Sequence, residues 1–169
     1  MSHPERTRVA TACSASVSAR PAESVSNRAA PASERTSSVR TRTQPRVLVV
    51  DDGEEARDLY CECLEFHGIR AESAEDGATG LTKAVSLQPD LIVLDFSMPR
   101  MDGGEVLRRL HADERTHAIP VVLVTAVLEL VDPRVRGACA AVLEKPCEPD
   151  RLVQTIGHVL EAHGHRRLG

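Results

Sequence analysis

From Arg46 onward, short runs of apolar residues alternate along the chain with segments whose apolar residues recur at helical spacing. The runs Val47–Val50 and Leu91–Leu94 are continuous and aliphatic, as strands buried on both faces of a sheet require. Residues 69–74 form a more polar run, which is typical of a strand near the edge of a sheet. The predicted strands cover residues 47–50, 69–74, 91–94, 119–124 and 140–143.

The segments that follow these runs carry their apolar residues on one helical face. In residues 54–67, for example, Leu59 and Cys63 are four positions apart, and Gly68 then fits the position just past a helix end. The fourth segment contains Pro133, so its helix is expected to be short or broken. The predicted helices cover residues 54–67, 77–87, 105–111, 127–137 and 149–163. This alternation predicts an α/β fold with a doubly wound, five-stranded parallel sheet.

Residues 1–45 differ from the rest of the chain, because they are rich in Ser, Ala, Thr, Arg and Pro and lack Leu, Ile and Phe. Such a segment buries too little apolar surface to offset its chain entropy, so we expect a disordered tail. An organelle transit peptide, a basic arm for nucleic acid, and a start codon assigned too early remain alternatives. The expected boundaries are a tail over 1–45, one domain over 46–163 and a frayed end over 164–169.

Charge and cysteine content narrow the range of functions. Residues 1–46 hold eight Arg, no Lys and three Glu, whereas the remainder holds 13 basic and 22 acidic residues. The acidic domain is therefore not expected to bind nucleic acid through phosphate contacts. Five cysteines without a C-x-x-C pair indicate reduced thiols in a cytoplasmic protein. No apolar stretch approaches the length of a membrane span, and no secretory signal is expected.

Polar residues follow the strongest predicted strands at the point where each one ends. In doubly wound sheets, ligands bind outside the carboxyl ends of the strands, at the point where the strand order reverses. We therefore expect these side chains to converge on one edge of the domain. They are Asp51, Asp52, Asp95, Thr125 and Lys145.

Three carboxylates at one edge are electrostatically costly. Two unit charges ~4 Å apart repel each other by roughly 4 kcal/mol at an effective dielectric of about 20. A single lysine is too little compensation, and oxygen ligands suit a hard divalent cation, so the sequence predicts a Mg²⁺ site. The alternative is that Asp51, Asp52 and Asp95 are solvated strand ends or helix N-caps. The histidines His158, His163 and His165 lack a zinc-type partner set, and we expect a solvated helix end there.

Four stretches resemble the signatures of the response-regulator receiver family of two-component signal transduction, in that family's order. The similarity covers residue 46 to about residue 163 and implies a flavodoxin-like fold with strand order 2-1-3-4-5. The stretches are Val47-Leu48-Val49-Val50-Asp51-Asp52, the run Leu91-Ile92-Val93-Leu94-Asp95-Phe96-Ser97-Met98-Pro99-Arg100-Met101-Asp102-Gly103, Val124-Thr125-Ala126 and Lys145-Pro146.

The resemblance implies a role for each matching residue. Asp95 corresponds to the phosphoacceptor, and Thr125 and Lys145 to the hydroxyl and the ammonium that contact its phosphoryl group. Pro146 corresponds to a proline that follows a cis peptide bond. The implied Mg²⁺ ligands are Asp52 and Asp95 directly, Asp51 through water, and the backbone carbonyl of Ser97.

A receiver of this kind accepts a phosphoryl group from a sensor histidine kinase or a phosphotransfer protein. Few residues follow the last predicted helix, so we expect no output domain and a signal that passes to a partner protein. We do not expect an enzyme beyond its own phosphorylation and dephosphorylation. One alternative is a Mg²⁺-dependent phosphatase with an aspartate nucleophile, although such enzymes carry an acid where this chain has Ser97. Another is an interaction module that works without phosphorylation.

Three positions depart from the family's pattern. Val142 stands where receivers commonly carry Tyr or Phe, and Cys147 stands where Phe often follows Lys-Pro. The segment between Thr125 and Gly137 is short and contains Pro133. Together, these departures predict a non-standard surface for the partner that reads the phosphorylation state.

Overall fold

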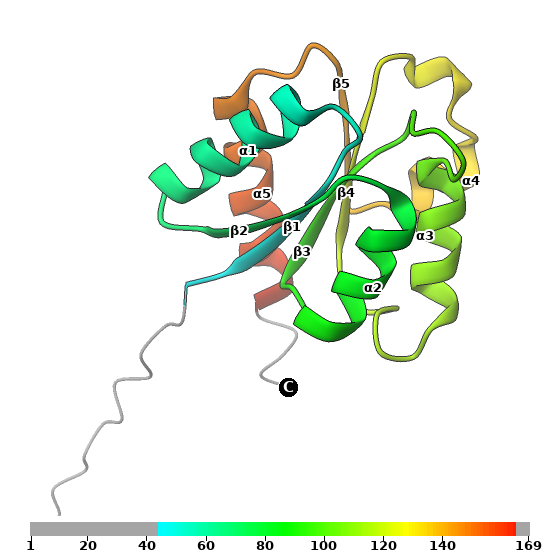
Figure 1. Cartoon of the computed structure of the whole chain (residues 1–169), viewed down its shortest axis with the longest axis horizontal. Coiled ribbons are helices and arrows are strands. Elements are labelled where there is room, and N and C mark those ends of the chain that lie inside the picture. The colour runs from blue at the N-terminus through cyan, green and yellow to red at the C-terminus, as the bar shows by residue number, and fades with distance from the viewer. Residues whose placement is uncertain (1–43, 165–169) are drawn as a thin grey trace, which may run out of the picture. The chain divides into compact units, whose positions relative to one another are not determined.

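A computed structural model describes residues 44–164, which form a parallel five-stranded sheet in the order β2-β1-β3-β4-β5 (Figure 1). The predicted doubly wound α/β fold and its strand order are confirmed. The tail predicted over 1–45 and the frayed end predicted over 164–169 lie outside the described residues, apart from residues 44, 45 and 164. The strands are β1 Arg46–Val50, β2 Arg70–Ala74, β3 Leu91–Asp95, β4 Val121–Thr125 and β5 Ala141–Glu144.

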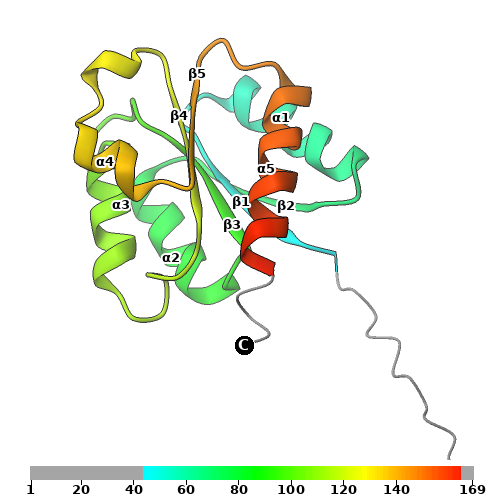
Figure 2. The same ribbon diagram turned by 180° about the vertical axis from the view of Figure 1, so that it is seen from behind.

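Helices cover both faces of this sheet, with α1 and α5 on one face and α2 and α3 on the other (Figures 1 and 2). The alternation of side chains along β1 explains the two layers. Val47 and Val49 pack against α1 and α5, whereas Leu48 and Val50 pack against α2 and α3. The helices are α1 Glu54–Phe66, α2 Gly77–Leu87, α3 Gly103–Ala112, α4 Pro133–Ala138 and α5 Pro149–Gly164, with a 3₁₀ turn η1 at Leu128–Leu130.

The segment between β4 and β5 is broken, as the proline predicted. Pro133 occupies the first turn of α4, where its missing N–H costs no hydrogen bond. Asp132 caps this helix by accepting a hydrogen bond from the backbone N–H of Arg134 at 2.7 Å. The helical segment expected over 127–137 consists of η1 and the six-residue α4, in agreement with the expectation of a short or broken helix.

Strand β4 begins later than the apolar pattern predicts. The run was expected to start at Ile119, but β4 starts at Val121 and extends through Thr125. Pro120 has no N–H to give to the ladder, which removes it from a strand that has neighbours on both sides. No helix within residues 44–164 is long and apolar enough to cross a membrane.

Candidate functional site

The carboxyl ends of β1, β3, β4 and β5 meet at one edge of the sheet. Parallel pairing aligns Val50 of β1 with Leu94 of β3, and Thr125 of β4 with Glu144 of β5. The residues next along the chain, Asp51 and Lys145, are therefore brought to the edge at which Asp95 ends β3. This edge includes the switch point of the topology, since β1 and β3 are neighbours whose connections leave in opposite directions.

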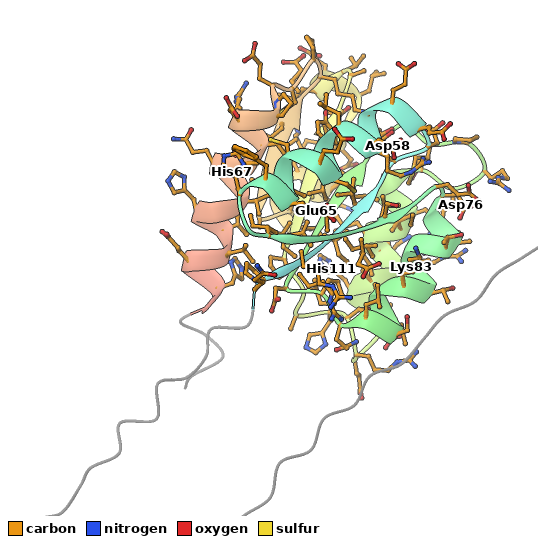
Figure 3. All side chains as sticks on the ribbon, turned by 60° about the vertical axis from the view of Figure 1, so that its left-hand side comes forward. Asp58, Glu65, His67, Asp76, Lys83 and His111 are labelled. Carbon is orange, nitrogen blue, oxygen red and sulfur yellow. The ribbon has the colours of Figure 1, made fainter. Side chains whose placement is uncertain are left out.

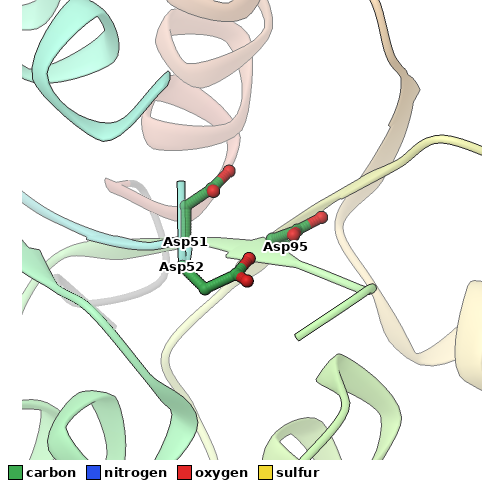
Figure 4. Close-up of side chains that lie close together, drawn as sticks. All are labelled: Asp51, Asp52 and Asp95. Carbon is green, nitrogen blue, oxygen red and sulfur yellow. The ribbon is translucent and has the colours of Figure 1, made fainter. Parts of the chain in front are cut away.

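Three carboxylates gather at this edge. Asp51, Asp52 and Asp95 each offer an oxygen, and these oxygens all lie within 4.8 Å of one another. Figure 4 shows Asp51 and Asp52 diverging from the end of β1, with Asp95 beside them at the end of β3. Asp51 and Asp95 are buried and Asp52 is exposed, so the cluster opens to solvent on one side.

Lys145 is the cation of this cluster. Its Nζ donates a hydrogen bond to Asp51 Oδ2 at 2.9 Å and lies 3.2 Å from Asp95 Oδ1. Its backbone N–H donates to the carbonyl of Thr125 at 2.7 Å, which fixes the lysine beside the end of β4. The Lys145–Pro146 peptide bond is cis, as the resemblance implied.

Burial and neighbouring charges at this edge together shift two pKa values. Burial raises the pKa of Asp95, and the nearby charge of Lys145 only partly counters this effect. Burial alone would lower the pKa of Lys145, but its hydrogen bond to Asp51 and the charge of Asp95 outweigh burial and raise that pKa. The ammonium therefore stays charged, while Asp95 carries its negative charge at an energetic cost.

The environment of Asp95 suits a further cation. Asp95 Oδ1 is buried, and its one close polar neighbour among the described side chains is the ammonium of Lys145 at 3.2 Å, a contact that does not count as a hydrogen bond. A buried acceptor left in this state normally indicates a missing partner. The donor set around it consists of carboxylate oxygens only, which is the chemistry that Mg²⁺ prefers. The residues present therefore fit a hard divalent cation.

Backbone contacts hold the acids in place. The N–H of Gly53 donates to Asp51 Oδ1 at 2.8 Å, and an Nη of Arg57 donates to the carbonyl of Asp51 at 2.9 Å. Gly103 lies against the acceptor strand, because a Cβ at Gly103 would come within 2.6 Å of the carbonyl oxygen of Asp95. Only a residue without a side chain allows this loop to fold so closely onto β3.

The hydroxyl of Thr125 is directed into its own turn. Thr125 is buried, and its Oγ1 donates to the carbonyl of Val127 at 3.3 Å and accepts from the N–H of Val127 at 3.2 Å. The structure thus brings Asp51, Asp52, Asp95 and Lys145 together. It places Thr125 at the adjacent strand end, and Ser97 lies in an exposed loop.

Sequence reasoning missed two neighbours of the site. Arg57 lies one turn into α1 and reaches back to Asp51, which the helical spacing after Asp52 could have suggested. Tyr60 is buried in the core between α1 and α5 together with Cys147. Burial raises the pKa of Tyr60, and the charges of Lys145, Asp51 and Asp95 also act on it, so its ring lies near the acidic cluster.

Of the other candidates, the histidines form no metal group within residues 44–164, where the aspartate trio is the group that could hold an ion. His163 bonds through Nδ1 to the carbonyl of Val159 at 2.9 Å, as a helix-end side chain does. His165 and Cys13 lie outside the described residues. The four described cysteines are free thiols.

A parallel sheet whose strand ends carry an acidic trio beside a lysine defines the class of this domain, a doubly wound α/β fold with a candidate cation site at its switch point. The model of one family, the response regulator receiver domain, matches residues 47–157. The chain therefore belongs to the response-regulator receiver family, as the resemblance predicted.

Individual relatives agree with this assignment. The chain is 38% identical over 119 residues to the "DNA-binding dual master transcriptional regulator RpaA" of Synechocystis, a match that covers 69% of this chain and 49% of that protein. It is 34% identical over 117 residues to protein PilH of Pseudomonas aeruginosa, covering 68% of this chain and 97% of PilH. The match thus spans about half of the first relative and nearly all of the second.

Solved structures show the same architecture. Chemotaxis protein CheY4 of Vibrio cholerae superposes with a TM-score of 0.63 at 27% identity, covering 69% of this chain and 99% of CheY4. A CheY-like receiver domain of Methanospirillum hungatei gives a TM-score of 0.68 at 27% identity, covering 73% and 99% of the two chains. Receiver domains are signalling modules that bind Mg²⁺ through acidic residues and interact with histidine kinases or phosphotransfer proteins and with downstream effectors.

Proposed function

We propose that Asp95 accepts a phosphoryl group from a histidine kinase or a phosphotransfer protein, and that the chain passes the signal to a partner protein. One observation carries the proposal. The carboxylate of Asp95 is buried beside Lys145 and two further acids, and its Oδ1 has no hydrogen-bond partner. A lone structural aspartate would not be kept in such surroundings, because they disfavour its charged form.

In the proposed reaction, a carboxylate oxygen of Asp95 attacks the phosphorus of a phosphohistidine and forms a new O–P bond. The P–N bond breaks, its electron pair leaves with the imidazole, and the departing ring takes up a proton. The residues that would hold Mg²⁺ are Asp51, Asp52, Asp95 and the carbonyl of Ser97. When bound, Mg²⁺ neutralises charge on the transferring oxygens. Water then hydrolyses the acyl phosphate: its oxygen bonds to phosphorus, the bond between phosphorus and the Asp95 oxygen breaks, and inorganic phosphate leaves as the carboxylate is restored.

Lys145 and Thr125 are the groups placed to respond to the phosphoryl group. The ammonium can turn from Asp51 to a phosphoryl oxygen, since it already lies between the two carboxylates. The hydroxyl of Thr125 has to leave Val127 to reach the same group. Hydrogen bonds to charged groups contribute ~1.5–3 kcal/mol each, so two give roughly 3–6 kcal/mol. A shift of a two-state equilibrium from 1:99 to 99:1 requires about 5.5 kcal/mol, which lies near the upper end of this range, and the contacts given up at Asp51 and Val127 lower the net gain.

The turn that Thr125 holds carries exposed apolar side chains. Val127 is 42% exposed and Leu130, in η1, is 74% exposed. We propose that movement of this turn presents Val127 and Leu130 to the partner. Val142, at the family's usual aromatic position, is half-buried and packs against the core cluster on the α2 and α3 face. It offers no large ring to switch, which supports a readout through the turn.

A small phosphodonor tests the assignment of the acceptor. We expect acetyl phosphate with Mg²⁺ to add one phosphoryl group to the intact protein, measured by mass, and chelation of Mg²⁺ to prevent it. Asp95→Asn should abolish the gain, whereas Asp150→Asn, an exposed acid in the first turn of α5, should leave it unchanged. Equal labelling of Asp95→Asn, or steady turnover of a phosphomonoester, would contradict the proposal.

We also propose that the protein is located in the cytoplasm. The four described cysteines are free thiols, which supports this location because thiols stay reduced there.

A further inference from the structure

The loop between β3 and α3, residues 96–102, runs beside the Asp95 carboxylate, and we call it the β3–α3 loop. The N–H of Gly103 donates to the carbonyl of Phe96 at 2.9 Å, which closes the loop at its base. Burial raises the pKa of Asp95, and hydrogen bonding by the backbone N–H of Ser97 is among the smaller effects that oppose this rise. The conformation of the loop therefore decides which backbone groups face the Asp95 carboxylate.

The tip of this loop has a strained backbone at Arg100. Its φ is 68°, in the left-handed region that residues with a long side chain rarely adopt. The N–H of Met101 donates to the carbonyl of Pro99 at 2.8 Å, so Arg100 is the central residue of a three-residue turn. A turn of this type with a positive φ at its centre is rare and strained. Such a conformation persists only where neighbouring contacts hold it.

An ion pair between Arg100 and Asp76 is one such contact. Nη2 of Arg100 donates to Oδ2 of Asp76 at 2.9 Å, and the two residues are 24 positions apart in the chain. Asp76 is itself held in place, because its Oδ1 caps α2 by accepting from the N–H of Thr79 at 2.8 Å. Figure 3 shows Asp76 at the surface of the domain, where α2 begins. The tip of the β3–α3 loop is thus anchored to the amino end of α2.

An apolar contact accompanies the ion pair. Met101 is partly buried and packs against the core cluster on the α2 and α3 face. A Cβ at Gly77, the first residue of α2, would come within 3.1 Å of Met101 Sδ and within 2.6 Å of Val106 Cγ2. The side chain of Arg100, in contrast, is 76% exposed. The charged contact can therefore be removed without disturbing the packing of the core.

We infer that Arg100 is a positioning residue of the cation site, because its ion pair with Asp76 holds the β3–α3 loop in the conformation that sets Ser97 beside Asp95. The inference rests on the proposed function, since the site that it serves is the proposed Mg²⁺ site. Arg100 touches none of the reacting atoms and acts through the backbone of the loop. Loss of the ion pair releases the strained turn, so the loop occupies other conformations and the binding-competent fraction of the protein falls.

Charge and position predict opposite effects for Arg100. A guanidinium near an acidic cluster repels a cation, so removal of a group that acts through its charge alone would tighten Mg²⁺ binding. Removal of a positioning group weakens Mg²⁺ binding, because fewer molecules have the loop in place. Removal of the Asp76 carboxylate weakens binding by either route. Weaker binding in both neutral variants is therefore specific to the positioning role.

Titration of the full chain with Mg²⁺ by isothermal calorimetry tests the inference on Arg100→Asn and Asp76→Asn. Asn adopts positive φ more readily than Arg and also caps helices, so each variant removes a charge and keeps the local backbone. We expect each to raise the Mg²⁺ dissociation constant by about two- to fivefold, the range open to an exposed ion pair. The double variant should bind no more weakly than either single variant, because both remove the same contact. Arg100→Lys keeps the charge and should recover most of the affinity.

Asp113→Asn and Arg115→Asn are the matched controls. Their exposed ion pair lies just past the carboxyl end of α3, so both should bind Mg²⁺ as the unmodified protein does. Without Mg²⁺, the amide resonance of Ser97 should move in the same direction in Arg100→Asn and Asp76→Asn and stay in place in the controls. Tighter binding by Arg100→Asn, or additive effects in the double variant, would overturn the inference and leave the proposed function intact. An unmodified protein that binds no Mg²⁺ would overturn both.

Discussion

The ammonium of Lys145 lies 3.2 Å from Oδ1 of Asp95, although its hydrogen bond goes to Asp51, at 2.9 Å. One cation therefore serves two buried carboxylates that belong to different strand ends. This arrangement leaves Asp95 with an incomplete set of partners. The same arrangement makes the free energy of unfolding sensitive to the residues and ions around Asp95.

Replacing Lys145 by Ala should destabilise the protein. Breaking a buried ion pair costs about 3–5 kcal/mol, and we expect on the order of 2 kcal/mol here, because the Lys145 side chain is 26% exposed. Mg²⁺ should restore part of this loss, since it compensates the same carboxylates. The chain's other lysine, Lys83, donates only to the carbonyl of Ser73 and is the matched control. Urea unfolding with and without Mg²⁺ measures both variants; an equal Mg²⁺ response in Lys83→Ala and Lys145→Ala would contradict this prediction.

The raised pKa of Asp95 predicts a pH dependence. Because the folded state binds this proton more tightly than the unfolded state, stability should fall as pH rises from the ordinary value of 3.8 through the folded pKa. Asp95→Asn removes this contribution, so its advantage in unfolding free energy over the unmodified protein should grow with pH. Denaturant unfolding at several pH values between about 4 and 7, without Mg²⁺, gives the difference. Parallel stability curves for the two proteins would show that Asp95 carries no such penalty.

Thr125 should connect the phosphorylation site to the exposed turn. On phosphorylation, the amide resonances from Val127 to Val131 are expected to shift, because the hydroxyl of Thr125 leaves the backbone of Val127. Thr125→Ala should still be phosphorylated but should lose most of these shifts, whereas Thr125→Ser keeps the hydroxyl and should retain them. Full shifts at the turn in phosphorylated Thr125→Ala would show that the hydroxyl does not connect the site to the turn.

Val142→Tyr tests the contribution of Val142 to partner binding. Its affinity for the partner is compared with that of the unmodified protein, with and without phosphorylation.

Gly103 should tolerate no side chain. The Cβ of Gly103→Ala would meet backbone atoms, Asp95 O at 2.6 Å and Phe96 Cα at 2.8 Å, so the loop has to move. We expect a loss of about 1–3 kcal/mol in unfolding free energy, together with slower phosphorylation. Gly157→Ala is the control: nothing lies within 4 Å of that Cβ, and alanine within α5 should add about 0.5–1 kcal/mol. A neutral Gly103→Ala would show that the close approach is not required.

The sequence was sufficient for the sheet and for most of the site because both follow from local patterns. A continuous apolar run such as Val47–Val50 specifies a buried strand, and parallel strands must end at one edge, which brings Asp51, Asp95 and Lys145 together. Helical spacing places Arg57 one turn after Asp52, but it does not decide whether this side chain bonds to the carbonyl of Asp51 or to one of the acids of α1.

The orientation of the Thr125 hydroxyl also could not be predicted from the sequence. A threonine at a strand end can bond either to a neighbouring site or to the backbone two residues further on, and the second choice is the one observed. The start of β4 depended on the missing N–H of Pro120 in a ladder with partners on both sides. Both the orientation of this hydroxyl and the start of β4 depend on which of several possible hydrogen bonds forms, and the local sequence does not decide that choice.

Chemical trapping of the acyl phosphate tests the central claim most directly. The protein is incubated with a small phosphodonor and Mg²⁺ and then treated with borohydride, which reduces an aspartyl phosphate to homoserine, and the peptides are analysed by mass spectrometry. We predict homoserine at position 95, no such product without phosphodonor, and unmodified aspartate at positions 51 and 52. Homoserine at position 51 or 52, or a phosphoryl group that survives borohydride on another side chain, would contradict the account.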